Sequence, residues 1–251
     1  MIVLLVPPAR IELTTARLEG GCSIQLSYGD INRYSNIPLY RVGMSQLFVV
    51  HPANPQPRLI KQAAELLQSG KLVAVPTDSS YAVVARLDDK AAADGLRRLR
   101  GLDERHHLTV LCRDLAAISH FAKVDNAQYR LLKHATPGPW TFILEASREV
   151  PRRVSHPSRK TIGIRVPDHP VTLALLEAAD TPLLSTTLIP ESEEEPLNEP
   201  ELIRERYQHV LGAVIDAGAC LLEPTTVIDL TGAVPEVLRR GRGDPALLGL
   251  D

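Results

Sequence analysis

Residues 72–87 read LVAVPTDSSYAVVARL, and this stretch decides the fold. Two apolar runs flank a polar segment, and Pro76 at its start lacks the N–H that a further strand residue would donate. The pattern predicts two buried strands joined as a hairpin by a loop rich in hydroxyl groups. Thr77, Asp78, Ser79 and Ser80 are therefore expected together at the ends of two strands.

Strand and helix patterns alternate irregularly on both sides of this hairpin. The expected strands are 45–51, 108–112, 136–144, 161–166, 182–189, 213–218, 225–231 and 236–241. Expected helices begin at Asn54-Pro55, after Asp89, Asp114 and Asp125, and at 171–179 behind an Asp168 cap, while 191–201 is expected to be an acidic loop. The irregular order favours a mixed α/β sheet over strict βαβ repetition.

The composition is that of an ordinary folded protein. Hydrophobic residues make up 44% and charged residues 23% of 251 residues, which excludes a disordered tail, a collagen-like chain and a coiled-coil rod. Twenty Pro and fifteen Gly indicate short elements joined by turns. No apolar run approaches the roughly 18 residues of a membrane span, so no membrane partner is expected.

The first 43 residues show no sustained hydrophobic period, and we interpret them as a disordered extension or a misassigned start, with residues 44–251 as the folded domain. Cys22, Cys112 and Cys220 contain no CxxC pair, so neither a disulfide framework nor a structural zinc site is indicated. The start MIVLLVPPAR lacks a secretory pattern, which predicts a cytoplasmic location.

Arginine dominates the basic residues, since only six of the 28 are Lys. The Arg residues gather within 97–105, 152–165 and 239–242, and the planar guanidinium suits phosphate recognition. A place on the solvated surface explains any single Arg equally well.

Several common catalytic motifs are absent from the sequence. It has no GxGxxG after a strand, no GxxxxGK[ST], no HExxH and no GxSxG. His106-His107 fits a loop better than a metal site, so no metal ligand is expected.

Hydroxyl groups and Arg stand where several predicted strands end. They lie at 77–80, 185–187 and 225–226, with Arg165 and Arg239 at the ends of two more strands. Open α/β sheets bind small ligands at strand ends, where hydroxyls can orient an amino acid or phosphate and Arg can offset phosphoryl charge. Each Thr taken alone is also explained by strand propensity.

Six motifs occur in a recognisable order: VPTDSSYAV (75–83), TPGPWTFIL (136–144), TIGIRVPDHP (161–170), PLLSTTL (182–188), PTTVIDLT (224–231) and VLRRG (237–241). From about Met44 onward the chain resembles the YrdC/YciO family, most of all its bacterial YciO proteins. The resemblance implies a single YrdC-like α/β domain, with a twisted mixed β-sheet, flanking helices and a concave basic face.

The resemblance also implies an activity. The family's synthases are nucleotidyltransferases that combine ATP, L-threonine and bicarbonate into L-threonylcarbamoyl-AMP and pyrophosphate, an intermediate of tRNA threonylcarbamoyladenosine modification. ATP is then a substrate, and Mg²⁺ can enter with it. Some members bind tRNA or double-stranded RNA, so RNA is an expected partner, bound through phosphate contacts and A-form shape.

Site residues carry over from the motifs, and no acid–base dyad is among them. The positions that match the threonine site are Ser79, Thr161, Arg165, Ser185 and Thr225. The positions that match the nucleotide site are Arg100, His106, Thr187 and Arg239. A reaction of this kind needs positioning and charge stabilisation more than a catalytic dyad.

Two positions depart from the synthase pattern. Arg100-Gly101-Leu102 stands for KxR, and Thr187-Leu188-Ile189 stands for SxN. Each lost contact could cost about 1.5–3 kcal/mol. Three interpretations stay open: a threonylcarbamoyl-AMP synthase-like enzyme, an RNA- or nucleotide-binding YciO-type paralogue with weak or no synthase activity, and a related hydrolase on the same fold.

Overall fold

The hairpin predicted at residues 72–87 lies inside the sheet. The computed structural model describes residues 44–103, 106, 108–152, 154–156, 158–191 and 193–250. In it β2 (Leu72–Val75) pairs antiparallel with β3 (Ala82–Arg86), and every residue of β2 is buried. The expected extension 1–43, together with Arg105 and Arg153 of the basic clusters, lies outside the described residues.

Ten strands form one mixed sheet in the order β1-β8-β2-β3-β7-β4-β6-β5-β9-β10. Besides β2 and β3 these are β1 (Gln46–Val49), β4 (Thr109–Leu111), β5 (Trp140–Glu145), β6 (Thr161–Arg165), β7 (Leu183–Thr187), β8 (Leu211–Asp216), β9 (Thr226–Asp229) and β10 (Glu236–Arg239). The sheet contains parallel pairs such as β4–β6 and antiparallel pairs such as β5–β6. The predicted mixed α/β sheet is confirmed.

Among the described residues, six α-helices connect the strands: α1 (Pro57–Gln68), α2 (Lys90–Leu99), α3 (Leu115–Phe121), α4 (Asn126–Ala135), α5 (Pro170–Ala179) and α6 (Pro200–Tyr207). The predicted caps of α2, α3 and α4 are confirmed, because the carboxylates of Asp89, Asp114 and Asp125 each accept a hydrogen bond from a first-turn N–H. Such bonds satisfy helix donors that have no partner within the helix.

Two helix predictions were wrong. The N-cap of α5 is His169 rather than Asp168, and its side chain makes no capping bond; Pro170, whose backbone is already suited to a first turn, begins the helix. The expected acidic loop 191–201 ends inside α6, which buries Ile203. Its eight residues are too few for a clear apolar period. Within the part of the chain described, no helix is long and apolar enough to cross a membrane.

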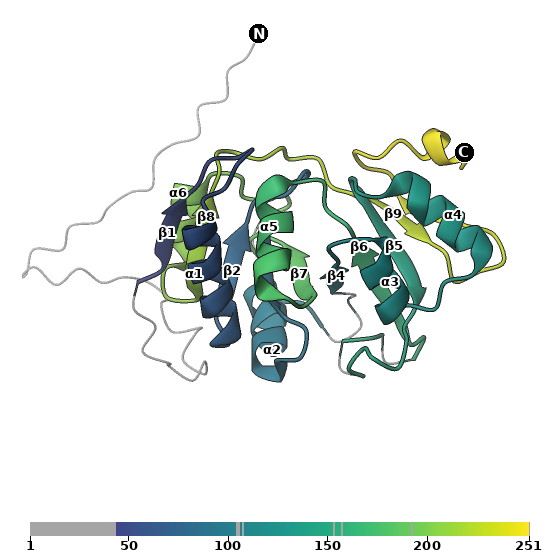
Figure 1. Cartoon of the computed structure of the whole chain (residues 1–251), viewed down its shortest axis with the longest axis horizontal. Helices are drawn as coiled ribbons and strands as arrows, with labels where there is room; N and C mark the ends of the chain where they lie inside the picture. Colours follow the sequence, from purple (N-terminus) through teal and green to yellow (C-terminus); the bar gives the residue numbers. More distant parts are fainter. Residues whose placement is uncertain are drawn as a thin grey trace, which may run out of the picture. The chain divides into compact units, whose positions relative to one another are not determined.

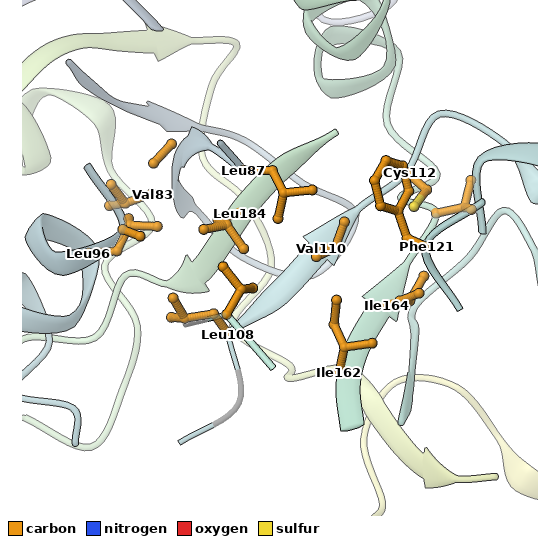
Figure 2. Packing of buried hydrophobic residues seen from close by; sticks show 14 of the residues in the cluster. Val83, Leu87, Leu96, Leu108, Val110, Cys112, Phe121, Ile162, Ile164 and Leu184 are labelled. Carbon is orange, nitrogen blue, oxygen red and sulfur yellow. The ribbon is translucent and has the colours of Figure 1, made fainter. Parts of the chain in front are cut away.

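Helices cover both faces of the sheet. On one face α1 and α5 lie side by side against β2, β3 and β8 (Figure 1), and their buried residues form one apolar cluster with Val73, Val84 and Ala213. On the other face a second cluster continues across β3, β7, β4 and β6. Figure 2 shows this cluster from Leu96 of α2 to Phe121 of α3.

The face that carries α1 and α5 changes character along the sheet. Successive residues of a strand point to opposite faces, so Thr161, Gly163 and Arg165 of β6 share a face, opposite to the buried Ile162 and Ile164. The ladder aligns Gly163 with Thr109 and Thr109 with Ser185. The same surface that is apolar at β2 and β3 is therefore lined by hydroxyls and a guanidinium at β4 and β6.

Candidate ligand-binding site

Residues 76–81, here called the PTDS loop, are held in shape by one side chain. The hydroxyl of Thr77 donates to the carbonyl of Ser80 at 2.7 Å and accepts from the backbone N–H groups of Ser79 and Ser80, each at 3.2 Å. Tyr81 is fully buried, and its hydroxyl donates to the carbonyl of Gly218 at 3.0 Å. The loop is thus fixed to the strands and to the segment after β8.

Arg165, at the end of β6, is the centre of the site. Its Nη1 donates to Ser79 Oγ at 3.1 Å, and its Nη2 donates to Thr77 Oγ1 at 3.4 Å and to Asp78 Oδ1. The side chains of Arg165 and Asp78 are only 8% and 7% exposed. Burial lowers the pKa of Arg165, the charge of Asp78 opposes this, and the positive charges of Arg242 and Arg239 lower it further.

The ion pair leaves two polar atoms without a hydrogen-bond partner among the described residues. They are Oδ2 of Asp78 and Nε of Arg165, and both are buried. A buried polar atom that lacks a partner costs about 1–3 kcal/mol. Both atoms are covered by surrounding protein atoms, so the pair is an unfavourable arrangement in the interior of the domain.

A second group of contacts joins β5 and β10 to Thr225, the residue before β9. Arg239 donates to Thr225, with Nη2 at 2.9 Å from its carbonyl oxygen and 3.1 Å from its hydroxyl. The hydroxyl of Thr225 also lies 2.9 Å from that of Thr141. The predicted nucleotide residue Arg239 and the predicted threonine residue Thr225 therefore touch directly.

The segment after β10 connects this group to the PTDS loop. Arg242 Nη1 donates to the carbonyl of Asp78, and its N–H donates to the carbonyl of Pro224 at 2.9 Å. The chain passes so close to residue 224 that a Cβ at Gly241 would lie 2.3 Å from the Pro224 carbonyl oxygen. A glycine is required there, and the approach brings Arg242 over the site.

Arg100 and His106 form the other predicted part of the nucleotide site. Arg100 Nη1 donates to the carbonyl of Ile189, and burial lowers the pKa of this guanidinium. Burial also lowers the pKa of His106, and the charges of Arg100, Arg97 and Arg239 lower it further. These side chains share one positive region, which suits an anionic ligand.

The remaining predicted residues lie nearby on the strands. Ser185 is buried and its hydroxyl donates to the carbonyl of Thr109 at 3.1 Å. Thr187 ends β7 opposite Ala82, the first residue after the PTDS loop. Thr161 is buried at the start of β6, four residues before Arg165. The structure thus joins Ser79 to Arg165 and Thr225 to Arg239 by direct bonds and places the others along the same strands.

Sequence reasoning did not assign Asp78, Arg242 or Thr141 to the site. Asp78 stands inside the PTDS loop, and Arg242 belongs to the basic run 239–242. The charge of each residue within a noted motif could therefore have identified both. Thr141 carried none, because a Thr within a strand is explained by β propensity. Its contact with Thr225 depends on the pairing of β5 with β9.

The cysteines and the acidic residues limit the chemistry. Burial raises the pKa of the Cys220 thiol to about 11 and that of Cys112 to about 12, so neither supplies a thiolate near neutral pH. Across the described residues, no group of three or more His, Cys, Asp or Glu could hold a metal ion. The arrangement instead offers guanidinium and hydroxyl groups, whose chemistry is hydrogen bonding and charge stabilisation.

The fold and this cluster define a class: an α/β protein whose mixed sheet carries Arg, Ser and Thr side chains clustered at strand ends. Comparison with known proteins narrows the class. A family model for Sua5, YciO and YrdC, with the description "Telomere recombination", matches residues 65–241. The chain belongs to the Sua5/YciO/YrdC family, and the predicted family is confirmed.

Similar sequences fall into two groups. The chain is 48% identical over 204 residues to an uncharacterized protein of Haemophilus influenzae, covering 81% of this chain and 99% of that one. It is 46% identical over 201 residues to Escherichia coli YciO, covering 80% and 98%. Identity to the threonylcarbamoyl-AMP synthase of Mus musculus is 31% over 180 residues, covering 68% of this chain and 62% of the synthase.

Solved structures with the same fold include a YciO protein and a Sua5 protein. The crystal structure of Escherichia coli YciO matches with a TM-score of 0.79 at 45% identity, covering 82% of this chain and all of that one. Sua5 of Pyrococcus abyssi, in complex with L-threonine, matches with a TM-score of 0.73 at 27% identity, covering 78% of this chain and 58% of Sua5. The chain therefore has the fold of a YrdC-like domain.

Proposed function

We propose that the protein is a threonylcarbamoyl-AMP synthase-like enzyme that uses ATP, L-threonine and bicarbonate. The observation that carries the proposal is the convergence of Ser79, Arg165, Thr225 and Arg239, which come from distant parts of the chain. The relation to Sua5 in complex with L-threonine supports threonine as the amino acid.

The proposed reaction has two bond-forming steps. Bicarbonate takes up a proton and releases water to give carbon dioxide. The neutral threonine amine then forms a bond to the carbon of carbon dioxide and releases a proton, which balances the proton taken up. An oxygen of the resulting carbamate then bonds to the α-phosphorus of ATP, while the bond to the pyrophosphate oxygen breaks. The products are threonylcarbamoyl-AMP, pyrophosphate and water. Mg²⁺ would enter with ATP.

In this proposal the protein acts by positioning and by offsetting charge. Ser79, Thr161, Arg165, Ser185 and Thr225 hold threonine. A second set, comprising Arg100, His106, Thr187 and Arg239, holds the nucleotide. The guanidinium groups would stabilise negative charge that develops on the α-phosphate as pyrophosphate leaves.

The test is a coupled assay on the purified full chain with ATP, threonine, bicarbonate and Mg²⁺. We expect pyrophosphate release that depends on threonine, together with threonylcarbamoyl-AMP detected by mass spectrometry. Reactions without threonine, in bicarbonate-depleted buffer, and with Arg165→Ala serve as controls. Pyrophosphate release that does not respond to threonine, or no release at all, contradicts the proposal.

A second candidate function is nucleotide or RNA binding without efficient synthesis. Two observations favour it. Arg100, a predicted phosphate-binding cation, already donates a hydrogen bond to the carbonyl of Ile189. Leu102 stands where the synthase pattern has an Arg. Four basic side chains are also exposed around the β5–β6 connection: Arg148, Arg152, Arg159 and Lys160. RNA retention that weakens steeply with salt, without product formation, would select this function.

A further inference from the structure

The two edge strands of the sheet, β1 and β10, differ in the features that keep another strand from pairing with them. β10 carries Glu236 and Arg239, and its pairing with β9 shifts register between Val237 and Arg239. Charges and such irregularities both oppose edge pairing. β1 reads QLFV, with no charged residue and no Pro, and it keeps one register along β8. The edge at β1 therefore lacks the protection that β10 has.

The outer side of β1 carries backbone groups that β8 does not use. The N–H of Val50 donates to the carbonyl of Asp216 at 2.7 Å, so residues 46, 48 and 50 direct their N–H and carbonyl groups toward β8. The same groups of Leu47 and Val49 point the other way, and among the described residues nothing bonds to them. Val49 is 63% exposed, so a second strand can reach this side.

A second copy of β1 can bond to all four of these groups. If the copies run antiparallel about a two-fold axis at Phe48, Leu47 faces Val49 of the second copy and Val49 faces its Leu47. Each facing pair then exchanges two hydrogen bonds. Leu47 and Val49 also share one face of the strand, so apolar side chains meet apolar side chains there. Pairing in this register ends at Pro52, which has no N–H.

We propose that the outer edge of β1 is an interface between two copies of this chain, whose sheets join antiparallel through Leu47 and Val49. The choice of a second copy follows from charge and shape. A facing strand must be neutral and apolar at these positions, and an identical strand always meets that requirement. Five strands separate β1 from β6, which carries Arg165, so the proposal does not depend on the proposed function (Figure 1).

The test measures the molar mass of the full chain by light scattering over a range of concentrations. An interface this small is typical of weak association, so half of the chains should be dimeric at about 50 μM. Val49→Lys should raise that concentration at least about tenfold, because a charge on an edge strand opposes pairing. Val234→Lys is the matched control: this residue is 74% exposed just before β10, and dimerisation should not change.

Hydrogen exchange on the wild type tests the same interface without any variant. Exchange at the amides of Leu47 and Val49 should slow as concentration rises, whereas the amide of Val50, already bonded to Asp216, should change less. A single chain at all concentrations up to about 500 μM overturns the proposal, since even a weak interface would assemble there. A dimer that Val49→Lys leaves intact, or that leaves exchange at Leu47 and Val49 unchanged, also overturns it.

Discussion

On the threonine side of the proposed site Arg165 meets three side chains of the PTDS loop, whereas on the nucleotide side Arg100 meets the main-chain carbonyl of Ile189. A side-chain acceptor depends on the residue at that position, but a backbone carbonyl is present whatever the residue. The Arg100 contact therefore does not depend on which side chain stands at residue 189. It also predicts unequal responses to substitution on the two sides.

The largest effect is expected from Arg165→Ala. Removal of the cation leaves Asp78 buried and uncompensated, which should lower the free energy of unfolding by about 3–5 kcal/mol in urea titrations. Threonine affinity should fall more than ATP affinity, because the proposed partner is a carboxylate. A companion variant with Asp78→Ala added should recover part of the stability. Equal losses for both ligands would remove the distinction between the two sides.

Arg239→Ala should show the reverse preference. Its proposed partner is a phosphate, and hydrogen bonds between charged groups are worth about 1.5–3 kcal/mol, so ATP affinity should fall by tens of fold. Threonine affinity should fall less, through the loosened Thr225 hydroxyl. Calorimetry with each ligand separately measures both numbers. A larger loss for threonine would place Arg239 on the other side of the site.

Ile189→Asn tests whether the nucleotide side can be improved. The amide restores a donor that the synthase pattern has at this half-buried position, and we expect about a tenfold gain in kcat/KM for ATP. Ile189→Val is the control, since it changes volume without adding a polar group. The same gain from both variants would show that packing, rather than the amide, limits the nucleotide side.

Arg242→Ala should have a smaller effect, of about fivefold on threonine affinity, because one hydrogen bond to the Asp78 carbonyl is lost at an exposed side chain. The neighbouring exposed Arg240→Ala is the matched control and should leave affinity unchanged. An equal loss in both variants, measured at several salt concentrations, would indicate general electrostatic attraction.

The smallest effect concerns pH. The pKa of His106 is lowered by burial and by the charges of Arg100, Arg97 and Arg239, and a bound phosphate would offset those charges and favour the protonated imidazole. ATP binding would then take up a proton, so affinity should rise by about threefold as pH falls from about 8 to about 6. His106→Gln should abolish the dependence. If the slope persists in His106→Gln, another group is responsible.

The sequence predicted the parts of the fold that depend on local rules. Asp89, Asp114 and Asp125 cap helices as expected, and Gly70 follows α1 with a φ of +80°. The start of α6 was not predicted, because a short helix shows little period and its first residues are acidic. The order of the strands in the sheet was not predicted either, because it depends on pairing between distant segments, which a hydrophobic pattern alone does not encode.

For the site, the motifs supplied the residues and the structure supplied the bonds between them. Ser79 and Arg165 are 86 residues apart in the chain, and a hydrogen bond joins them. Asp78 was not assigned, since an acidic residue in a turn is ordinarily explained by turn preference. Its burial against Arg165 is a tertiary property.

Arg239 is the last residue of β10, which is one of the two edge strands of the sheet and has mostly exposed side chains. Outer strands fray at lower free energy than inner ones, so this guanidinium rests on one of the least anchored parts of the domain. Nucleotide residence time would then be limited by how often β10 detaches from β9. Conversely, a bound nucleotide would slow amide exchange along β10.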